Sequence, residues 1–189
     1  MTDEENLAGR DQGDKNMIQD DELDKTKITY RSLKSFGERQ EYTLIAELLR
    51  RGYDVYRPLV DDQGIDCILR RDMSNGPQYV DLQIKSTSKR VKHEDAGMFA
   101  GLQIRDPREN YLWAFYSEYI GATWVIPSLE LVSMASMNKT GKNIGKYTIN
   151  FAKVVKKEPF KREEFSKYEG EMGYKIIDQT FVNMGSRHY

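Results

Sequence analysis

The chain contains few of the residues that build disulfide frameworks or zinc sites. Its 189 residues include one cysteine, two histidines and five prolines. The single Cys67 excludes an internal disulfide and fits a reducing compartment, so we expect a cytoplasmic protein. Neither His93 nor His188 has cysteines or carboxylates at the spacing of zinc ligands, which disfavours a zinc site.

Long apolar runs are also missing from the sequence. No segment approaches the roughly 18 apolar residues of a membrane-spanning helix. The N-terminus is acidic and lacks the basic and then apolar pattern of a signal peptide. We therefore expect neither a membrane segment nor a secretion signal.

Negative charge is concentrated at the N-terminus. Residues 1–25 hold nine acidic and three basic side chains, a net charge of −6, so residues 26–189 carry +5 within a total of −1. The first 25 residues are too poor in apolar side chains to offset the entropy of ordering them. We predict a disordered or loosely attached acidic tail at 1–25 and one domain at 26–189. The tail either solubilises the protein or competes with a nucleic acid for the basic domain.

Apolar spacing predicts a helix followed by a strand meander. Four apolar residues recur at helical spacing between about residues 32 and 51, namely Leu44, Ile45, Leu48 and Leu49. Gly52 is a typical helix terminator. Three strands are predicted within residues 53–85, in the segments "YDVYRPL", "GIDCILRR" and "QYVDLQIKS".

The second half of the chain predicts further strands and short helices. Residues 86–110 are polar and irregular, and we expect a long loop there. Strands are predicted in "YLWAFYS", "ATWVIPS" and "KYTINF", and helices at 128–137, capped by Ser128, and in "FKREEFSKY". The type of the last segment, "YKIIDQTFV", stays open. The fold class we predict is α/β, with a central mixed sheet flanked by helices.

Polar residues stand at positions where the pattern predicts apolar ones. At about 100° per residue, Glu41 points along the apolar stripe of the first helix, where a carboxylate is costly unless it is paired or metal-bound. An ion pair with an arginine is the structural alternative. In the third strand Asp81, Gln83 and Lys85 share the face opposite the apolar one. Asp66 opens the second strand, where it either caps a turn or lies within reach of Gln83 and Lys85.

Such a set of side chains suits phosphodiester hydrolysis. Two carboxylates and an amide supply the hard oxygen ligands that Mg²⁺ prefers. A lysine beside them can orient or deprotonate a water and can stabilise the charge of a phosphate under attack.

In their order along the chain these segments resemble the core of the PD-(D/E)XK nuclease superfamily. The layout is similar to that of archaeal Holliday-junction resolvases and Mrr-type restriction endonucleases, and the resemblance covers about residues 32–90. The motifs are short, so their order and spacing carry the identification. The matching positions are Gly37 and Glu41 on the helix, Gly52 and Tyr53 at its end, Asp66 at the second strand, and Gln83 and Lys85 of a Q-x-K motif.

The resemblance implies a restriction-endonuclease-like core and a Mg²⁺-dependent DNA endonuclease in which Mn²⁺ can replace Mg²⁺. It implies that Asp66, Gln83 and the backbone carbonyl of Ile84 bind the metal. Glu41 would act directly or through a water, and Lys85 would position the nucleophile. Ser86 would touch a phosphate of a duplex or branched DNA, and a homodimer would allow cleavage of two strands.

Two further expectations concern charge. Gln83 removes one negative charge from the expected metal site, and Asp81, two residues earlier on the same face, could compensate from a direct or an outer position. The loop after the third strand offers Lys89, Arg90 and Lys92 to the substrate, unless it is only a solvated loop. The alternatives are a nuclease fold that binds a nucleic acid or a partner without cutting, and a regulatory protein that acts through its acidic tail.

Overall fold

The computed structural model describes residues 33–60 and 63–186. Residues from Gly37 onward form one compact unit, which contains the site discussed below. The predicted acidic tail, residues 1–25, lies outside the described residues. In the described part of the chain, no helix is long and apolar enough to cross a membrane.

Helix α2 (Leu33–Arg50) packs an apolar stripe onto the sheet. Leu44, Ile45 and Leu48 are buried as predicted, whereas Leu49 is 53% exposed, so the prediction for Leu49 was wrong. Leu49 lies roughly 90° from the centre of the stripe, because successive helical residues are rotated by about 100°. Gly52 follows the helix with a φ of +84°, a left-handed conformation that favours glycine and ends the helix where the sequence predicts.

A central mixed sheet of five strands confirms the predicted fold class. Its strand order is β1-β2-β3-β5-β6. The strands are β1 (Asp54–Tyr56), β2 (Cys67–Met73), β3 (Gly76–Thr87), β5 (Tyr111–Ser117) and β6 (Ala122–Pro127). The first three form the predicted antiparallel meander, β3 and β5 run parallel, and β6 is antiparallel to β5.

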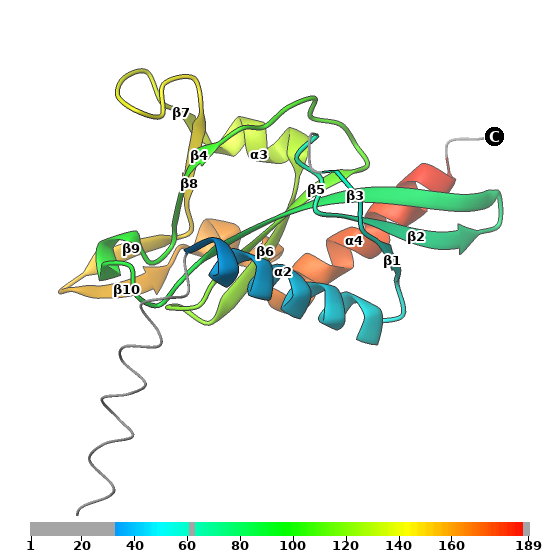
Figure 1. The fold of residues 1–189 in the computed structure, drawn as a ribbon, viewed down its shortest axis with the longest axis horizontal. Helices are drawn as coiled ribbons and strands as arrows, with labels where there is room; N and C mark the ends of the chain where they lie inside the picture. Colours follow the sequence, from blue (N-terminus) through cyan, green and yellow to red (C-terminus); the bar gives the residue numbers. More distant parts are fainter. Residues whose placement is uncertain (1–32, 61–62, 187–189) are drawn as a thin grey trace, which may run out of the picture. The chain divides into compact units, whose positions relative to one another are not determined.

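The two faces of this sheet carry different layers (Figure 1). Helices α2 and α4 (Gly170–Gly185) cover one face and bury aliphatic residues such as Leu48, Leu82 and Ile177. Helix α3 (Ser128–Met134) and a second sheet, of order β4-β8-β7, cover the other face over an aromatic cluster that includes Trp113 and Phe151. The strands of the second sheet are β4 (Met98–Leu102), β7 (Ser136–Met137) and β8 (Tyr147–Asn150).

A two-stranded hairpin and two short 3-10 helices complete the described chain. The hairpin joins β9 (Ala152–Val155) to β10 (Glu158–Lys161). The short helices are η1 (His93–Asp95) and η2 (Glu163–Tyr168). The final segment, of open type in the sequence, is the helix α4, and Ile177 and Phe181 are buried on its inner side.

Several sequence predictions for the second half need correction. The expected loop at 86–110 contains the end of β3, η1 and β4. The helix predicted at 128–137 ends at Met134, and the segment 160–168 begins in β10 and continues as a 3-10 helix. Ser128 does not cap α3. Its hydroxyl instead accepts a hydrogen bond from the backbone N–H of Arg108 and donates one to the carbonyl of Arg108.

Candidate active site

Asp66 is held at the entrance of β2 by a defined turn. Gly64 has a φ of +71°, and its carbonyl accepts a hydrogen bond from the Tyr111 hydroxyl at 2.7 Å. The backbone N–H of Asp66 then donates to the carbonyl of Leu82 at 2.9 Å, which ties the residue to β3. The turn and the strand pairing together direct the Asp66 carboxylate toward the middle of β3.

The Asp66 carboxylate is buried and receives two hydrogen bonds from β3. Its Oδ2 atom accepts from the Gln83 side-chain Nε2 at 2.5 Å and from the backbone N–H of Ile84 at 2.5 Å. Asp66 is 9% exposed and Gln83 is 3% exposed. A buried carboxylate requires such donors, because charge-assisted hydrogen bonds replace the water that it loses.

The Gln83 amide lies where protein oxygens converge. Its Nε2 atom contacts Asp66 Oδ2 and also lies 3.5 Å from the carbonyl oxygen of Ile84. Its Oε1 atom faces Gly64, and a Cβ atom added at residue 64 would lie 3.0 Å from that oxygen. A rotation of the amide by about 180° would exchange its two ends and bring Oε1 toward Asp66.

Glu41 approaches this group from helix α2. Its Oε2 atom lies 3.3 Å from Arg57 Nη2, so the ion pair considered from the sequence is present. Burial raises the pKa of the Glu41 carboxyl and the negative charge of Asp66 raises it further, while the cations Arg57 and Lys85 lower it. These influences bring Glu41, Asp66 and Lys85 into one electrostatic group, although Glu41 and Asp66 come from different elements.

Lys85 and Ser86 lie near the end of β3. Lys85 is half-buried on the same face as Gln83, two residues earlier, and pairs with Phe115 of β5. Beyond the strand, Lys89 and Arg90 are exposed, and their backbone N–H groups donate to Glu118 Oε2 and Ser88 Oγ. These basic side chains, with the exposed Lys92, therefore lie on the segment that leaves the candidate site.

Asp81 has a partner of its own. Its Oδ2 atom lies 2.6 Å from Arg108 Nη2, and the guanidinium of Arg108 lies over the Tyr111 ring at 4.7 Å. The charge that Asp81 could lend to the site is thus already balanced by Arg108. Its compensating role stays a prediction that requires this pair to open.

Sequence reasoning missed four residues around the site, namely Arg57, Arg108, Tyr111 and Trp113. Arg57 pairs with Glu41, Arg108 pairs with Asp81, and Tyr111 holds the turn before Asp66. Trp113 lies beside Gln83 in the sheet, and its buried Nε1 has no hydrogen-bond acceptor among the described residues. Its position next to Gln83 depends on the β3–β5 pairing, which the sequence does not give.

The donor set fits a hard divalent cation. Asp66 supplies a carboxylate and Ile84 a backbone carbonyl close to the same amide, and Gln83 would add its oxygen once the amide turns over. Across residues 33–60 and 63–186, no three acidic, histidine or cysteine side chains form a metal-binding group. The candidate ligands are therefore oxygen atoms, and only the Asp66 carboxylate among them is charged. Such sites suit Mg²⁺, which keeps several of its waters.

Comparison with known proteins supports a nuclease-like fold. No protein-family profile and no curated protein sequence matches the chain. Among solved structures, the fold is similar to that of a bacterial homing endonuclease, I-Ssp6803I, with a TM-score of 0.53 and 20% identity. The similarity covers 82% of this chain and 99% of that chain. At this identity the similarity concerns the fold, and the chain has a mixed α/β fold of the kind found in a nuclease.

Proposed function

We propose that this chain is a metal-dependent DNA endonuclease of the PD-(D/E)XK type whose site consists of Glu41, Asp66, Gln83 and Lys85. The observation that carries the proposal is the convergence of Asp66, the Gln83 amide and the Ile84 carbonyl at one point. Lys85 follows on the same face of β3. The similarity to a homing endonuclease fold supports a DNA substrate.

Each residue has a role that its surroundings support. Asp66, with the Gln83 and Ile84 oxygens, would hold Mg²⁺ or Mn²⁺, and the metal would supply charge to a phosphate and acidify a water. Lys85 would orient the water and stabilise the phosphate in the transition state. Glu41, whose pKa is raised by burial and by Asp66, is a stronger base than an ordinary glutamate, which suits it to accept a proton from that water.

The substrate contacts follow from the position of the site at the end of β3. Ser86 would touch the phosphate next to the cleaved one. Lys89, Arg90 and Lys92, on the segment after β3, would contact the backbone of a duplex or branched DNA. A homodimer would place one site on each strand of a duplex.

The test of this proposal is cleavage of a supercoiled plasmid with Mg²⁺, Mn²⁺ or EDTA. We expect cleavage with either metal, none in EDTA, and a loss of at least about 100-fold in Asp66→Asn and Lys85→Ala. Asp72→Asn is the matched control, because Asp72 is an exposed carboxylate on β2, the strand that begins directly after Asp66. The proposal fails if Asp66→Asn and Lys85→Ala cut as fast as the wild type.

A second function is favoured by one specific feature. The Gln83 amide presents its nitrogen to Asp66 and carries no charge, so the metal-free site is already internally satisfied. A protein that binds DNA on this fold without cutting it would show salt-dependent binding, indifference to chelators and no cleavage with any metal. The plasmid assay separates the two functions.

A further inference from the structure

We infer that residues 138–162, called here the lysine arm, form a phosphate-binding surface that holds a DNA duplex next to the candidate site. This inference deepens the proposed function and rests on it for the nature of the substrate. The arm carries seven lysines and one arginine against one glutamate, a net charge of +7. Because residues 26–189 together carry +5, the rest of that region is net negative at −2. The positive charge of the domain is therefore a local property of the arm.

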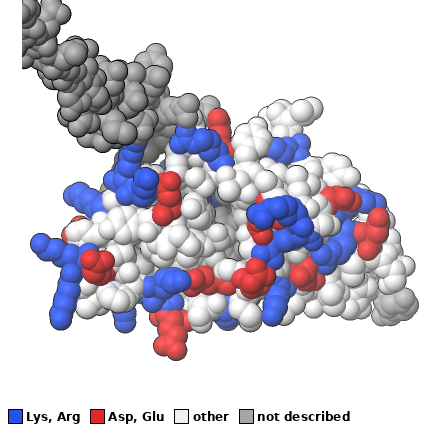
Figure 2. All heavy atoms as spheres, turned by 90° about the horizontal axis from the view of Figure 1, so that it is seen from below, with Lys and Arg blue, Asp and Glu red and all other residues white. Residues whose placement is uncertain are grey.

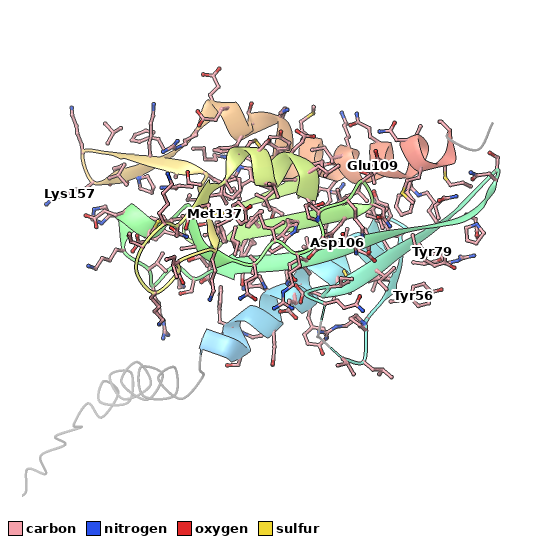
Figure 3. The ribbon with its side chains drawn as sticks, turned by 90° about the horizontal axis from the view of Figure 1, so that it is seen from above. Tyr56, Tyr79, Asp106, Glu109, Met137 and Lys157 are labelled. Atoms are coloured by element: carbon pink, nitrogen blue, oxygen red, sulfur yellow. The ribbon has the colours of Figure 1, made fainter. Side chains whose placement is uncertain are left out.

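The lysine arm has two projecting segments, which are joined by strand β8. One is the loop 138–146 between β7 and β8, and the other is the β9–β10 hairpin, with Lys157 at its outer end (Figure 3). Figure 2 shows basic side chains predominating at the end of the molecule where this hairpin lies, while acidic and basic side chains mingle elsewhere on that face. Lys161 is paired with Glu169, and Arg162 with Glu164.

Six lysines of the arm remain available to a ligand. Within residues 33–60 and 63–186 the structure pairs none of these six with a carboxylate: Lys139, Lys142, Lys146, Lys153, Lys156 and Lys157. Five of them are exposed, and Lys146 is half-buried. Ammonium groups are compact point charges that bind phosphates without reading bases, so the arm fits the backbone of a nucleic acid.

The turn of the hairpin gives a second, independent observation. Lys156 and Lys157 form the two-residue connection between β9 and β10, with φ of +52° and +69°. Two positive φ values are typical of a type I′ turn, which Asn-Gly satisfies far better than two lysines. The hairpin therefore carries two cations at its tip, although both lysines must adopt a left-handed backbone conformation that is unfavourable for them. Such strain at an exposed position indicates a role in binding rather than in folding.

The arm is fixed to the body through the aromatic core. Phe151, between β8 and β9, is fully buried and stacks on Trp124 with a centroid distance of 4.6 Å. Its backbone N–H donates to the carbonyl of Gly97 at 2.9 Å. A Cβ atom at residue 97 would lie 2.6 Å from Ala152, so glycine is required for this close approach.

The position of Gly97 connects the arm to the site. Residue 97 comes shortly after η1, and η1 contacts both strands of the hairpin. The segment that follows β3, the strand of Lys85, ends in η1. The arm thus continues the basic segment of Lys89, Arg90 and Lys92. A cation array on a rigid base loses little entropy on binding, and a duplex lying along it would reach the candidate site.

The test uses a variant that separates binding from folding. Lys156→Asn combined with Lys157→Gly removes two charges and supplies the residues that the turn prefers. Binding of a fluorescent duplex is measured by anisotropy in EDTA between roughly 50 and 200 mM salt. We expect the slope of log K against log salt to fall by about 2, because each lost phosphate contact changes the slope by about 0.9. The melting temperature should rise, since the left-handed residues are relieved.

Two further variants complete the design. Arg50→Gln with Lys175→Gln removes the same charge from α2 and α4, on the other side of the sheet, and should leave the slope unchanged. If the turn variant is destabilised, Lys139→Gln with Lys142→Gln in the loop is used in its place, with the same expected loss of slope.

The outcomes distinguish this inference from the proposed function. An unchanged slope in the arm variants, or an equal loss in the control, overturns the inference and leaves the proposed function standing, because no metal or cleavage is involved. Failure of the wild type to bind the duplex overturns the inference and, with it, the DNA substrate.

Discussion

The replacement Gln83→Glu tests the candidate site most directly, because it changes the one group that lies between the Asp66 carboxylate and the Ile84 carbonyl oxygen. Gln83 Nε2 donates to Asp66 Oδ2 at 2.5 Å, and both residues are almost completely buried. A carboxylate at this position exchanges the donor for a second negative charge in contact with the first. Gln83→Glu also makes the Q-x-K motif the E-x-K of the resembling family.

The expected cost without metal can be worked out from these contacts. Loss of a hydrogen bond to a charged group costs about 1.5–3 kcal/mol. Two buried carboxylates in contact repel, and the pair relieves this only by taking up a proton, at a similar cost. We therefore expect Gln83→Glu to lower the free energy of unfolding by about 3–5 kcal/mol in EDTA at neutral pH.

A divalent cation should reverse part of this loss. The variant offers the metal one more charge, so its affinity rises, and a metal at about 100 times its dissociation constant stabilises the folded protein by about 2.7 kcal/mol. Urea unfolding followed by the fluorescence of the buried Trp113 and Trp124 measures both effects, with and without Mg²⁺. Calorimetric titration of Mg²⁺ into both proteins measures the affinity itself.

The matched control is Gln83→Met, which removes the donor without adding charge and should show no response to Mg²⁺. The reasoning is refuted if Gln83→Glu is as stable as the wild type in EDTA. It is also refuted if Mg²⁺ stabilises Gln83→Glu and the wild type equally. The first result would place residue 83 out of contact with the Asp66 carboxylate, and the second would place it away from the metal.

Three other predictions follow from contacts of the site. The raised pKa of Glu41 means that the folded state holds its proton to higher pH than the unfolded state, so this residue's contribution to stability falls as pH rises through that interval. Glu41→Gln should remove this pH dependence, measured by urea unfolding across pH, while abolishing cleavage. Arg108→Ala should cost about 1–3 kcal/mol, because it leaves the largely buried Asp81 carboxylate unpaired, and Asp81→Asn in the same background should recover most of this in a double-mutant cycle. Tyr111→Phe removes the hydrogen bond to Gly64 and should cost about 1 kcal/mol of stability, with a larger relative loss of kcat than of substrate affinity if the turn positions the site.

The predictable parts of the fold are those in which the spacing of residues along the chain determines whether each side chain is buried or exposed. Alternation along β3 predicted that Val80, Leu82 and Ile84 would be buried, and they are. The end of α2 at Gly52 follows from the positive φ that glycine adopts without strain. The contact between Asp66 and Gln83 follows from pairing β2 with β3 as a hairpin.

The parts that were missed depend on pairings between segments far apart in the chain. Strand β4 pairs with β8, about 50 residues later, and Gly97 just before β4 and Gly101 within it weaken any local strand signal. The pairing of Asp81 with Arg108 depends on the path of an irregular segment, which no periodicity encodes. Ser128 has the composition of a helix cap, but its hydroxyl is bonded to that same segment.

The amide at position 83 has a physical consequence for the proposed enzyme. A carboxylate there would bind the metal more tightly but would leave two charges in contact whenever the metal is absent. Gln83 instead donates to Asp66, so the site without metal is a satisfied hydrogen-bonded pair. The exchange lowers metal affinity and raises the stability of the metal-free protein. Substrate phosphates would then contribute more to holding the metal, because the protein supplies fewer charges, and metal and DNA should bind cooperatively. A duplex held by the lysine arm would provide those phosphates next to the site, so removing arm charges should weaken Mg²⁺ binding measured in the presence of DNA and leave it unchanged in its absence.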